Sequence, residues 1–323
     1  MSAPLRVHVA DTLDASARES LAAKLSPWAA LGPLDQHTQV LVAGQPTRAQ
    51  LGAPGLRALL LPYAGLLPPT RRHLLAARPE LPVFNVHHHA TAVAELALTL
   101  ALCVLRRVVP LDRALRGGDW RPRFGTPCAS TLGERTALIV GCGHVGRRLG
   151  AALQALGVTV RGTQRRLDRP QVVEGIELHP AGALDDLLPA ADLLFVCAPL
   201  TPQTTGLLDA DRLARLPPGA VLVNVARAQI VDEDALYDAL LRHRLGGAGL
   251  DVWYDFPHEA TDRALTWPAH RPFWQLDNVV LSPHRAGLVR SSAATREAEL
   301  RAALHRLAHH ELPPGRVDVE AGY

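Results

Sequence analysis

A glycine-rich turn carries the clearest chemistry in this sequence. Gly141, Gly143 and Gly146 have the spacing Gly-x-Gly-x-x-Gly, follow the apolar strand-like run 136–140 and precede a helical pattern over residues 147–156. The first glycine permits a tight turn, the second lets a pyrophosphate approach the backbone, and the third lets the helix pack on the strand. The helix N-terminus adds N–H donors for an anion. This context predicts a dinucleotide-binding turn; the alternative is a plain glycine turn in an α/β fold.

The residues about 20 positions after the turn bear on the choice between two nicotinamide cofactors. A dinucleotide fold that prefers NAD has an acidic residue there, which binds the ribose hydroxyl. This chain has Gln164, Arg165 and Arg166 instead. Because arginine binds phosphate through two parallel hydrogen bonds, these residues favour NADP(H), with its ribose 2'-phosphate, over NAD(H). The alternative is that both arginines are solvated surface residues of an arginine-rich chain.

An arginine and a histidine in this sequence could act together on a substrate that carries a carboxylate and a carbonyl group. Such a substrate needs its carboxylate fixed and its carbonyl polarised, and Arg227, after a strand-like run, can do both with two parallel hydrogen bonds. Reduction also needs a proton for the developing alkoxide, and the imidazole of His284 titrates near neutrality. The alternatives are a surface arginine and a core histidine.

Three segments extend these observations to nearly the whole chain. Residues 198–207 read Ala-Pro-Leu-Thr-Pro-Gln-Thr-Thr-Gly-Leu, residues 223–233 surround Arg227, and residues 281–287 surround His284. At these spacings the sequence closely resembles the D-isomer-specific 2-hydroxyacid dehydrogenases. The resemblance implies an α/β fold of two Rossmann-like or flavodoxin-like domains with doubly wound parallel sheets and the active site in the interdomain cleft. It also implies hydride transfer between NAD(P) and a D-2-hydroxy acid or its 2-oxo acid, such as glyoxylate or hydroxypyruvate.

The same resemblance extends the cofactor site beyond the turn. His144 and Val145 would offer backbone N–H groups to the pyrophosphate, and Pro199 and Thr205 would line the adenosine side. Asp251 would accept a hydrogen bond from the carboxamide, with a strand-end cap as the alternative. The expected cofactor-binding set is Gly141, Gly143, His144, Val145, Gly146, Gln164, Arg165, Arg166, Pro199, Thr205, Ala226, Asp251, His284 and Gly287.

The segment after Asp251 departs from the family. The family pairs its histidine with a glutamate five residues after this aspartate, and here that position is Phe256. A phenyl ring can neither hold an imidazole tautomer nor raise the pKa of the histidine. Asp255, a third catalytic candidate, and Glu259 would reach His284 only if the loop has a different shape. Formate dehydrogenases of the same superfamily manage without this glutamate.

The substrate side of the site is expected near the start of the chain. Tyr63, Ala64 and Gly65 resemble the family's substrate-carboxylate loop, with an ordinary β-turn as the alternative. His89 takes the place of a substrate-facing asparagine, so the expected substrate-binding set is Tyr63, Ala64, Gly65, His89 and Arg227. No metal site is expected from the histidines at 87–89, because consecutive residues on an extended segment point in alternating directions.

Alternating strands and helices must position these residues, which is typical of parallel α/β folds. An apolar helical pattern over residues 91–109, ending at Pro110, separates two series of strands. We expect a substrate domain of residues 1–104 plus 288–323 and a dinucleotide-binding domain of residues 105–287. The insertion 258–273 would cap the cleft or a subunit interface. The strand-like runs are 6–10, 40–43, 57–61 and 83–86, then 136–140, 158–162, 193–197, 220–225, 247–251 and 278–281.

The composition excludes several other classes of protein. The 323 residues are 48% hydrophobic and 20% charged, as in soluble two-domain proteins. A net charge of +3 with scattered arginines gives no basis for nucleic-acid binding, and the longest apolar run, 96–105, is too short to span a membrane. Four cysteines without Cys-x-x-Cys spacing, and no signal-like N-terminus, favour the cytoplasm. The family usually dimerises through its cofactor domains, which implies a homodimer contact at residues 105–132.

Two alternative functions stay open beside a 2-oxo acid reductase. The first is a formate- or phosphite-type dehydrogenase, which the phenylalanine at position 256 allows. The second is a non-catalytic nucleotide-sensing binding protein, like the transcriptional corepressors that share this fold. The presence of Arg227 and His284 argues against the second alternative.

Overall fold

The computed structural model describes residues 3–10, 13, 15–125 and 129–323. The chain divides into two compact units, unit 1 with Met1–His89 and Val289–Tyr323, and unit 2 with Ala90–Leu288. Residues 126–128 of the expected dimer arm, including Cys128, lie outside the described residues. No helix in the described part is both long enough and apolar enough to cross a membrane.

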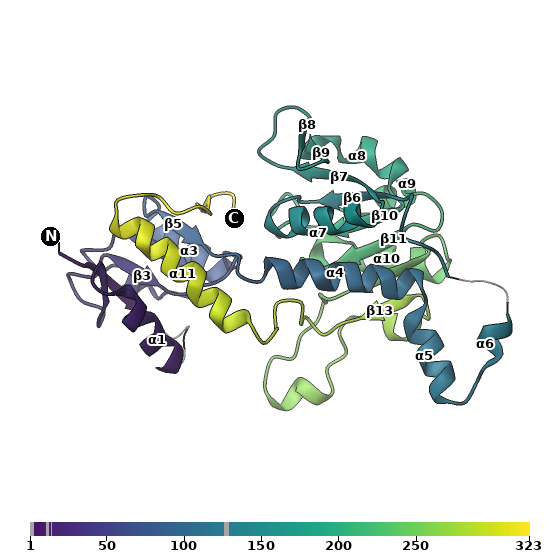
Figure 1. The fold of residues 1–323 in the computed structure, drawn as a ribbon, viewed down its shortest axis with the longest axis horizontal. Helices are drawn as coiled ribbons and strands as arrows, with labels where there is room; N and C mark the ends of the chain where they lie inside the picture. Colours follow the sequence, from purple (N-terminus) through teal and green to yellow (C-terminus); the bar gives the residue numbers. More distant parts are fainter. Residues whose placement is uncertain (1–2, 11–12, 14, 126–128) are drawn as a thin grey trace. The chain divides into compact units, whose positions relative to one another are not determined.

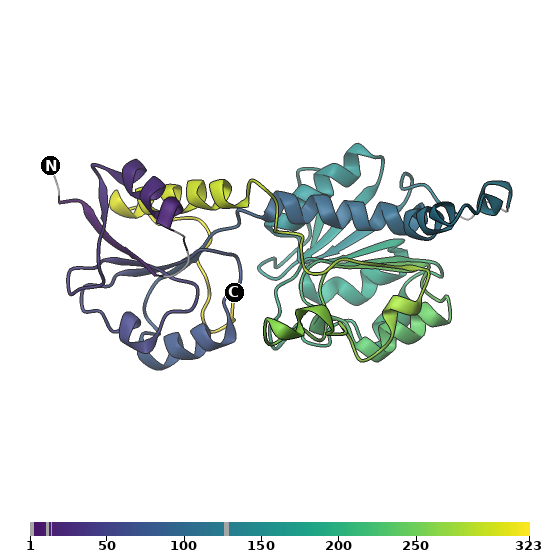
Figure 2. The ribbon, with the colours of Figure 1, turned by 90° about the horizontal axis from the view of Figure 1, so that it is seen from below.

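Unit 1 is a five-stranded parallel sheet with helices on both faces (Figure 2). The strand order is β2-β1-β3-β4-β5, with β1 at Leu5–Val9, β2 at Ala29–Leu31, β3 at Val40–Val42, β4 at Ala58–Leu61 and β5 at Val83–Asn85. The helices are α1 (Ala15–Leu25), α2 (Arg48–Leu51), α3 (Pro68–Ala77) and α11 (Ser292–Ala308).

Both ends of the chain build unit 1. Alternate strand residues such as Val7 and Leu60 pack in one apolar cluster with residues of α1 and α11, including Leu300. The neighbouring strand residues form a second cluster with α2 and α3 on the other face. The last residues also join the sheet edge, where the Val317 N–H donates to the Val83 carbonyl over 2.8 Å.

Unit 2 is an eight-stranded sheet with the order β13-β12-β11-β10-β6-β7-β9-β8, parallel except for the β8–β9 pair (Figure 1). The strands are β6 (Thr136–Val140), β7 (Thr159–Gln164), β8 (Gln171–Val173), β9 (Ile176–Pro180), β10 (Leu193–Val196), β11 (Val221–Asn224), β12 (Gly247–Leu250) and β13 (Val279–Leu281). The helices are α4 (Ala90–Leu105), α5 (Val108–Arg116), α6 (Arg121–Phe124), α7 (His144–Ala155), α8 (Leu184–Leu187), α9 (Ala210–Arg215) and α10 (Glu233–Leu241).

Two layers of helices enclose this sheet (Figure 2). Residues such as Ile139 and Phe195 pack with α4 and α7 on one face, and their neighbours Leu138 and Leu194 pack with α8, α9 and α10 on the other. Near-continuous apolar strands are expected when both faces are buried. The predicted α/β class with doubly wound parallel sheets is therefore confirmed.

The helix that follows unit 1 differs from the sequence-based expectation. It ends at Leu105 rather than at residue 109, because Arg107 adopts a left-handed backbone conformation with φ of 51°. Pro110 then lies in the first turn of α5, where a missing N–H costs no helical hydrogen bond. The structure divides the chain at residues 89/90, before α4, whereas the sequence-based boundary was placed at 104/105.

Candidate active site

The predicted motifs leave the unit 2 sheet side by side at the carboxyl ends of its parallel strands. One row of paired residues runs along this edge and consists of Leu281, Leu250, Asn224, Val196, Val140 and Thr163. The chain passes from β6 to β7 on one side of β6 and later to β10 on the other side. Open α/β sheets bind nucleotides at such a reversal of strand order.

The glycine turn between β6 and α7 has the geometry that a pyrophosphate needs. Gly141 has φ of 85°, and a Cβ atom there would collide with the backbone of Ala198. Gly143 precedes the first residue of α7, no side chain caps that helix, and a Cβ atom at Gly143 would meet nothing within 4 Å. His144 and Val145 form the start of the helix. The residues present therefore fit a dinucleotide whose pyrophosphate lies at this helix N-terminus.

The end of β7 lies directly beside this turn. The Cys142 N–H donates to the Thr163 carbonyl over 2.8 Å, and the Gly141 N–H lies 3.4 Å from the Thr163 hydroxyl. Gln164 is the last residue of β7, and the two following arginines, Arg165 and Arg166, are exposed. These three side chains thus begin where the ribose-recognition residue of a dinucleotide fold stands.

A compact loop follows β10 on the other side of the turn. The Thr204 hydroxyl donates to the Pro199 carbonyl over 2.7 Å, and the Thr205 hydroxyl donates to the Thr201 carbonyl over 2.9 Å. Pro199 and Thr205 are both exposed. The loop therefore holds its own shape and presents both predicted residues at the surface.

Arg227 lies in the loop after β11, and Asn224 holds that loop. The Asn224 side chain accepts from the Ala226 N–H and donates to the Arg227 carbonyl, both over 3.0 Å. The Arg227 guanidinium donates to the Ala226 carbonyl over 2.6 Å. The arginine is exposed, so its remaining donors are accessible to a carboxylate.

His284 lies in the loop after β13, and residues that follow β12 hold it. The Asp251 carboxylate accepts from the Ser282 hydroxyl, from the Arg285 N–H over 2.9 Å and from the Ala286 N–H over 3.0 Å. The Trp253 indole donates to the Ser282 carbonyl over 2.8 Å. Gly287 continues the same loop.

The environment of His284 disfavours the charged form of its imidazole. Partial burial lowers the pKa of His284 below its ordinary value, and the positive charge of Arg227 lowers it further, while the Asp251 carboxylate opposes both effects. The Phe256 ring, 43% exposed, lies 5.5 Å from the imidazole between centroids and tilted by 57°. An apolar ring therefore stands beside the histidine where the family has a carboxylate.

The two acids near Phe256 are placed differently. Asp255 lies 3.6 Å from the His270 imidazole, which also pairs with Glu233 over 3.1 Å. The Glu259 N–H donates to Asp262 over 3.2 Å in an exposed turn. Asp255 therefore pairs with His270, and the Phe256 ring contacts the His284 imidazole.

Four of the five predicted substrate residues lie in unit 1 beyond the ends of β4 and β5, and the fifth, Arg227, lies in unit 2. The Asn85 amide donates to the Ala64 carbonyl over 2.6 Å and so fixes the loop of Tyr63, Ala64 and Gly65. The rings of His88 and His89 meet edge to face, 4.9 Å apart. Burial lowers the pKa of His88 to about 4. No group of metal-ligand type gathers in the part of the chain that the structure describes.

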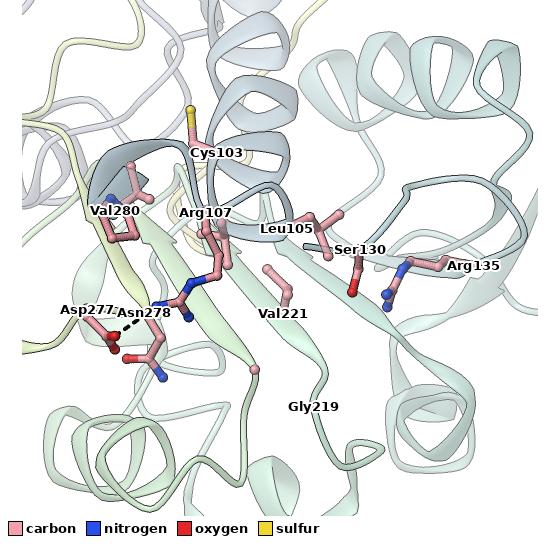
Figure 3. A pocket seen from close by; sticks show the side chains of 13 residues that line it. Cys103, Leu105, Arg107, Ser130, Arg135, Gly219, Val221, Asp277, Asn278 and Val280 are labelled. Carbon is pink, nitrogen blue, oxygen red and sulfur yellow. Dashed lines mark hydrogen bonds and ion pairs between the residues drawn. The ribbon is translucent and has the colours of Figure 1, made fainter. Parts of the chain in front are cut away.

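Three residues of the site were not singled out from the sequence: Asn224, Trp253 and Ser282. An asparagine inside the apolar strand 221–224 was the available signal, because a buried amide needs hydrogen-bond partners. A cavity of about 170 Å³ in unit 2 lies elsewhere, at the amino-terminal edge of the sheet (Figure 3). It is lined by residues such as Cys103, Arg107 and Asn278 and by none of the predicted site residues.

The unit 2 sequence matches a known family model. The model is described as the NAD-binding domain of D-isomer-specific 2-hydroxyacid dehydrogenases, and it matches residues 98–286. This range contains the whole row of motifs at the carboxyl edge of the sheet.

Individual relatives point the same way. A glyoxylate reductase from Thermococcus onnurineus is 34% identical over 71% of this chain, and a D-3-phosphoglycerate dehydrogenase from Mycobacterium leprae is 35% identical over 75% of it. The matches span 66% and 42% of those two proteins, less than two thirds of either. The crystal structure of a D-isomer-specific 2-hydroxyacid dehydrogenase from Xanthobacter autotrophicus Py2, in complex with NADPH and MES, is 26% identical over the full length of both chains, with a TM-score of 0.79.

Proposed function

The chain belongs to the D-isomer-specific 2-hydroxyacid dehydrogenase family, and on this premise we propose that it is an NAD(P)-dependent reductase of a small 2-oxo acid. The resemblance predicted from the three segments is thus confirmed. The observation that carries the proposal is the placement of Arg227 and His284 in loops from one sheet edge, where the charge of the arginine acts on the histidine. Relatives named glyoxylate reductase and D-3-phosphoglycerate dehydrogenase support a substrate of this class.

Each residue then has a role that its chemistry supports. When bound, the dinucleotide supplies or accepts the hydride. Arg227 binds the substrate carboxylate and polarises the carbonyl, and His284 gives a proton to the developing alkoxide in reduction and takes it back in oxidation. Backbone N–H groups after Gly143 would hold the pyrophosphate of the dinucleotide, and Asp251, Ala226 and Gly287 would border its nicotinamide ring.

NADP(H) is the proposed preferred form of the cofactor. Gln164 is uncharged, and Arg165 and Arg166 are exposed at the end of β7, next to the glycine turn. Two guanidinium groups favour a ribose 2'-phosphate over a hydroxyl group. The full-length structural relative from Xanthobacter autotrophicus contains NADPH, which supports this choice.

Unit 1 contains every proposed substrate-binding residue except Arg227. Tyr63, Ala64 and Gly65 form a loop that the Asn85 amide fixes, and backbone N–H groups of such a loop suit a carboxylate. His89 follows β5 and is proposed to face the substrate. Unit 1 is accordingly the proposed substrate domain, and unit 2 the proposed cofactor domain.

One observation favours a second candidate function. Phe256 stands beside His284, so the family's histidine–glutamate pair is missing. A dehydrogenase of the formate type transfers a hydride from an anionic donor that becomes CO2, with no hydroxyl proton to remove, so it has less need of that pair. A phosphite-type enzyme must also add a water oxygen to phosphorus, and it still needs a base for the protons of that water. We keep this activity as the alternative.

We also propose an assembly and a cellular location for the protein. Helix α5 has no buried residue and exposes four apolar side chains, which fits a homodimer contact of the cofactor domain; they are Val108, Val109, Leu111 and Leu115. The cysteine pattern favours a reducing cytoplasm.

A substrate panel tests the proposal. Purified protein is mixed with NADPH and glyoxylate, hydroxypyruvate or a longer 2-oxo acid, and in the other direction with NADP⁺ or NAD⁺ and formate or phosphite. The proposal predicts turnover of at least one 2-oxo acid and none of formate or phosphite. Turnover of formate or phosphite alone would establish the alternative, and cofactor binding without turnover would indicate a nucleotide sensor.

A further inference from the structure

Two buried polar residues lie at the carboxyl ends of two neighbouring strands in the unit 2 sheet. Asn224 ends β11 and Asp251 follows β12, and each is 1% exposed. The adjacent strand residues are apolar and buried. Burying an amide or a carboxylate is costly unless hydrogen bonds replace water, so their partners reveal what these side chains do.

Asn224 brackets the backbone that carries Arg227. Its carbonyl oxygen accepts from the Ala226 N–H and its amide donates to the Arg227 carbonyl, both over 3.0 Å. The Arg227 guanidinium in turn donates to the Ala226 carbonyl over 2.6 Å. The side chain of Asn224 therefore holds the backbone N–H of Ala226 and the backbone carbonyl of Arg227, the two residues at the base of the guanidinium side chain.

Asp251 does the same for the backbone that carries His284. Its two carboxylate oxygens accept hydrogen bonds from the hydroxyl of Ser282, which precedes the histidine. They also accept from the N–H groups of Arg285 and Ala286, which follow it. His284 has φ of 55°, a left-handed conformation that is unfavourable for a residue with a Cβ atom. Such a conformation persists only where the surrounding contacts impose it, and the Asp251 carboxylate supplies them.

The two brackets are joined to each other. The backbone N–H of Asp251 donates to the backbone carbonyl of Asn224 over 3.0 Å, and Asn224 pairs in register with Leu250. One backbone hydrogen bond therefore links the residue that holds the Arg227 loop to the residue that holds the His284 loop.

We propose that Asn224 and Asp251 are positioning residues that fix the Arg227 guanidinium and the His284 imidazole relative to each other. The inference rests on the proposed reductase function, because it assigns the pair to the placement of the carboxylate-binding and proton-transferring groups. It also explains how the histidine keeps an orientation beside Phe256, which offers no carboxylate. The Asp251 carboxylate fixes the backbone that carries the imidazole, whereas a glutamate partner would act on the imidazole ring itself.

Three variants test this proposal. Asn224→Ala removes both bonds to the Arg227 loop, and Ser282→Ala removes one bond of the Asp251 bracket while leaving the carboxylate in place. Asn278→Ala is the matched control, because Asn278 is also a buried asparagine of this sheet, 7% exposed, but donates to the Leu240 carbonyl at the opposite edge. A lost hydrogen bond lowers stability in all three, so thermal unfolding is recorded for each.

The kinetic readout separates positioning from stability. Asn224→Ala is expected to raise KM for the 2-oxo acid roughly tenfold and KM for NADPH by less, since the released loop carries Arg227 but only one of the proposed cofactor-binding residues, Ala226. Ser282→Ala is expected to lower kcat and shift its pH profile with a smaller change in KM. Asn278→Ala is expected to change neither. Equal loss of stability in Asn224→Ala and Asn278→Ala with unchanged KM and pH profile would overturn the proposal.

A second readout does not depend on turnover. The pKa of His284, measured by NMR with His284→Asn for assignment, responds to the distance of the Arg227 charge. It is expected to move in Asn224→Ala and to stay at the wild-type value in Asn278→Ala. If wild type reduces no 2-oxo acid, the function fails but this measurement still decides the positioning role. An unchanged pKa in Asn224→Ala would contradict it.

Discussion

His284 lies beside an aromatic ring, and its burial and the nearby Arg227 charge lower the pH at which it can donate a proton. Partial burial and the Arg227 charge lower the pKa of His284, and Phe256 offers nothing to raise it. Reduction requires the protonated imidazole, so kcat/KM for a 2-oxo acid should fall as pH rises through this lowered pKa. Oxidation requires the neutral imidazole and should persist down to the same pH.

Phe256→Glu should restore the missing partner. A carboxylate beside the imidazole favours its charged form, so the pKa of His284 should rise and the fall in reductive kcat/KM should move to higher pH. Phe256→Leu keeps the site apolar and serves as the control, with its profile at or below the wild-type position. Identical pH profiles for Phe256→Glu and wild type would show that position 256 does not act on the proton donor.

The proposed cofactor preference also belongs to single side chains. Arg166→Ser removes a guanidinium from the end of β7 and should raise KM for NADPH by roughly 10- to 100-fold while leaving KM for NADH nearly unchanged. Arg169→Ser, an exposed arginine three residues further on, is the control and should alter neither value. A parallel loss for both cofactors in Arg166→Ser would contradict selective binding of the 2'-phosphate.

The sequence identified the residues with distinctive chemistry but not those that hold them. Arg227, His284 and the glycine turn stand in recognisable patterns, and the structure places all of them in loops of one sheet edge. Asn224 and Ser282 act through bonds to backbone groups, which depend on loop conformation and leave no spacing rule in the sequence. The pairing of Asp255 with His270 likewise depends on how the loop after β12 folds.

Helix α4 illustrates what packing requires of whole elements. It lies against β12, and a Cβ atom at Gly249 would come within 2.7 Å of the Leu100 Cβ. Glycine in a strand normally weakens it, so its presence here marks a close approach of the helix. The long apolar pattern of residues 91–109 predicted a buried helix, but the left-handed Arg107 that ends it early depends on the fold and not on a local signal.

Gly249→Ala should therefore destabilise unit 2. The added methyl group meets the first carbon of a side chain, which cannot rotate away, so the free energy of unfolding should fall by about 1–3 kcal/mol. Gly182→Ala is the control, because a Cβ atom there meets nothing within 4 Å, and its effect should stay within about 0.5 kcal/mol. Equal stability of the two variants in urea unfolding would argue against this close packing.

The sequence predicted some strands and missed others, and the difference has a physical reason. Ten strand-like runs correspond to strands of the two sheets, because apolar runs of that length are needed where both faces are covered. Three strands without such runs were missed: β2, β8 and β9. Edge strands such as β2 and β8 have one neighbour only, so less apolar sequence is required of them.

At the scale of the whole molecule, the chain consists of two units, each with one sheet that is wholly or mostly parallel, and unit 1 contains both ends of the chain. The proposed assembly adds a second copy through α5. Leu111→Glu combined with Leu115→Glu places two charges on one face of this helix, which should convert a dimer to a monomer in light scattering. Leu156→Glu, at an exposed leucine after α7, should leave the mass unchanged. If the double variant remained a dimer, the dimer contact would not lie on α5.

The proposed reaction depends most directly on Arg227. Steady-state reduction of the best 2-oxo acid with NADPH is compared for wild type, Arg227→Ala and Arg242→Ala, an exposed arginine of the same unit. Removing two charge-assisted hydrogen bonds to the substrate should lower kcat/KM by roughly 10³-fold or more in Arg227→Ala, while Arg242→Ala stays near wild type. NADPH binding should survive in both variants. Near wild-type turnover in Arg227→Ala would contradict the proposed active site.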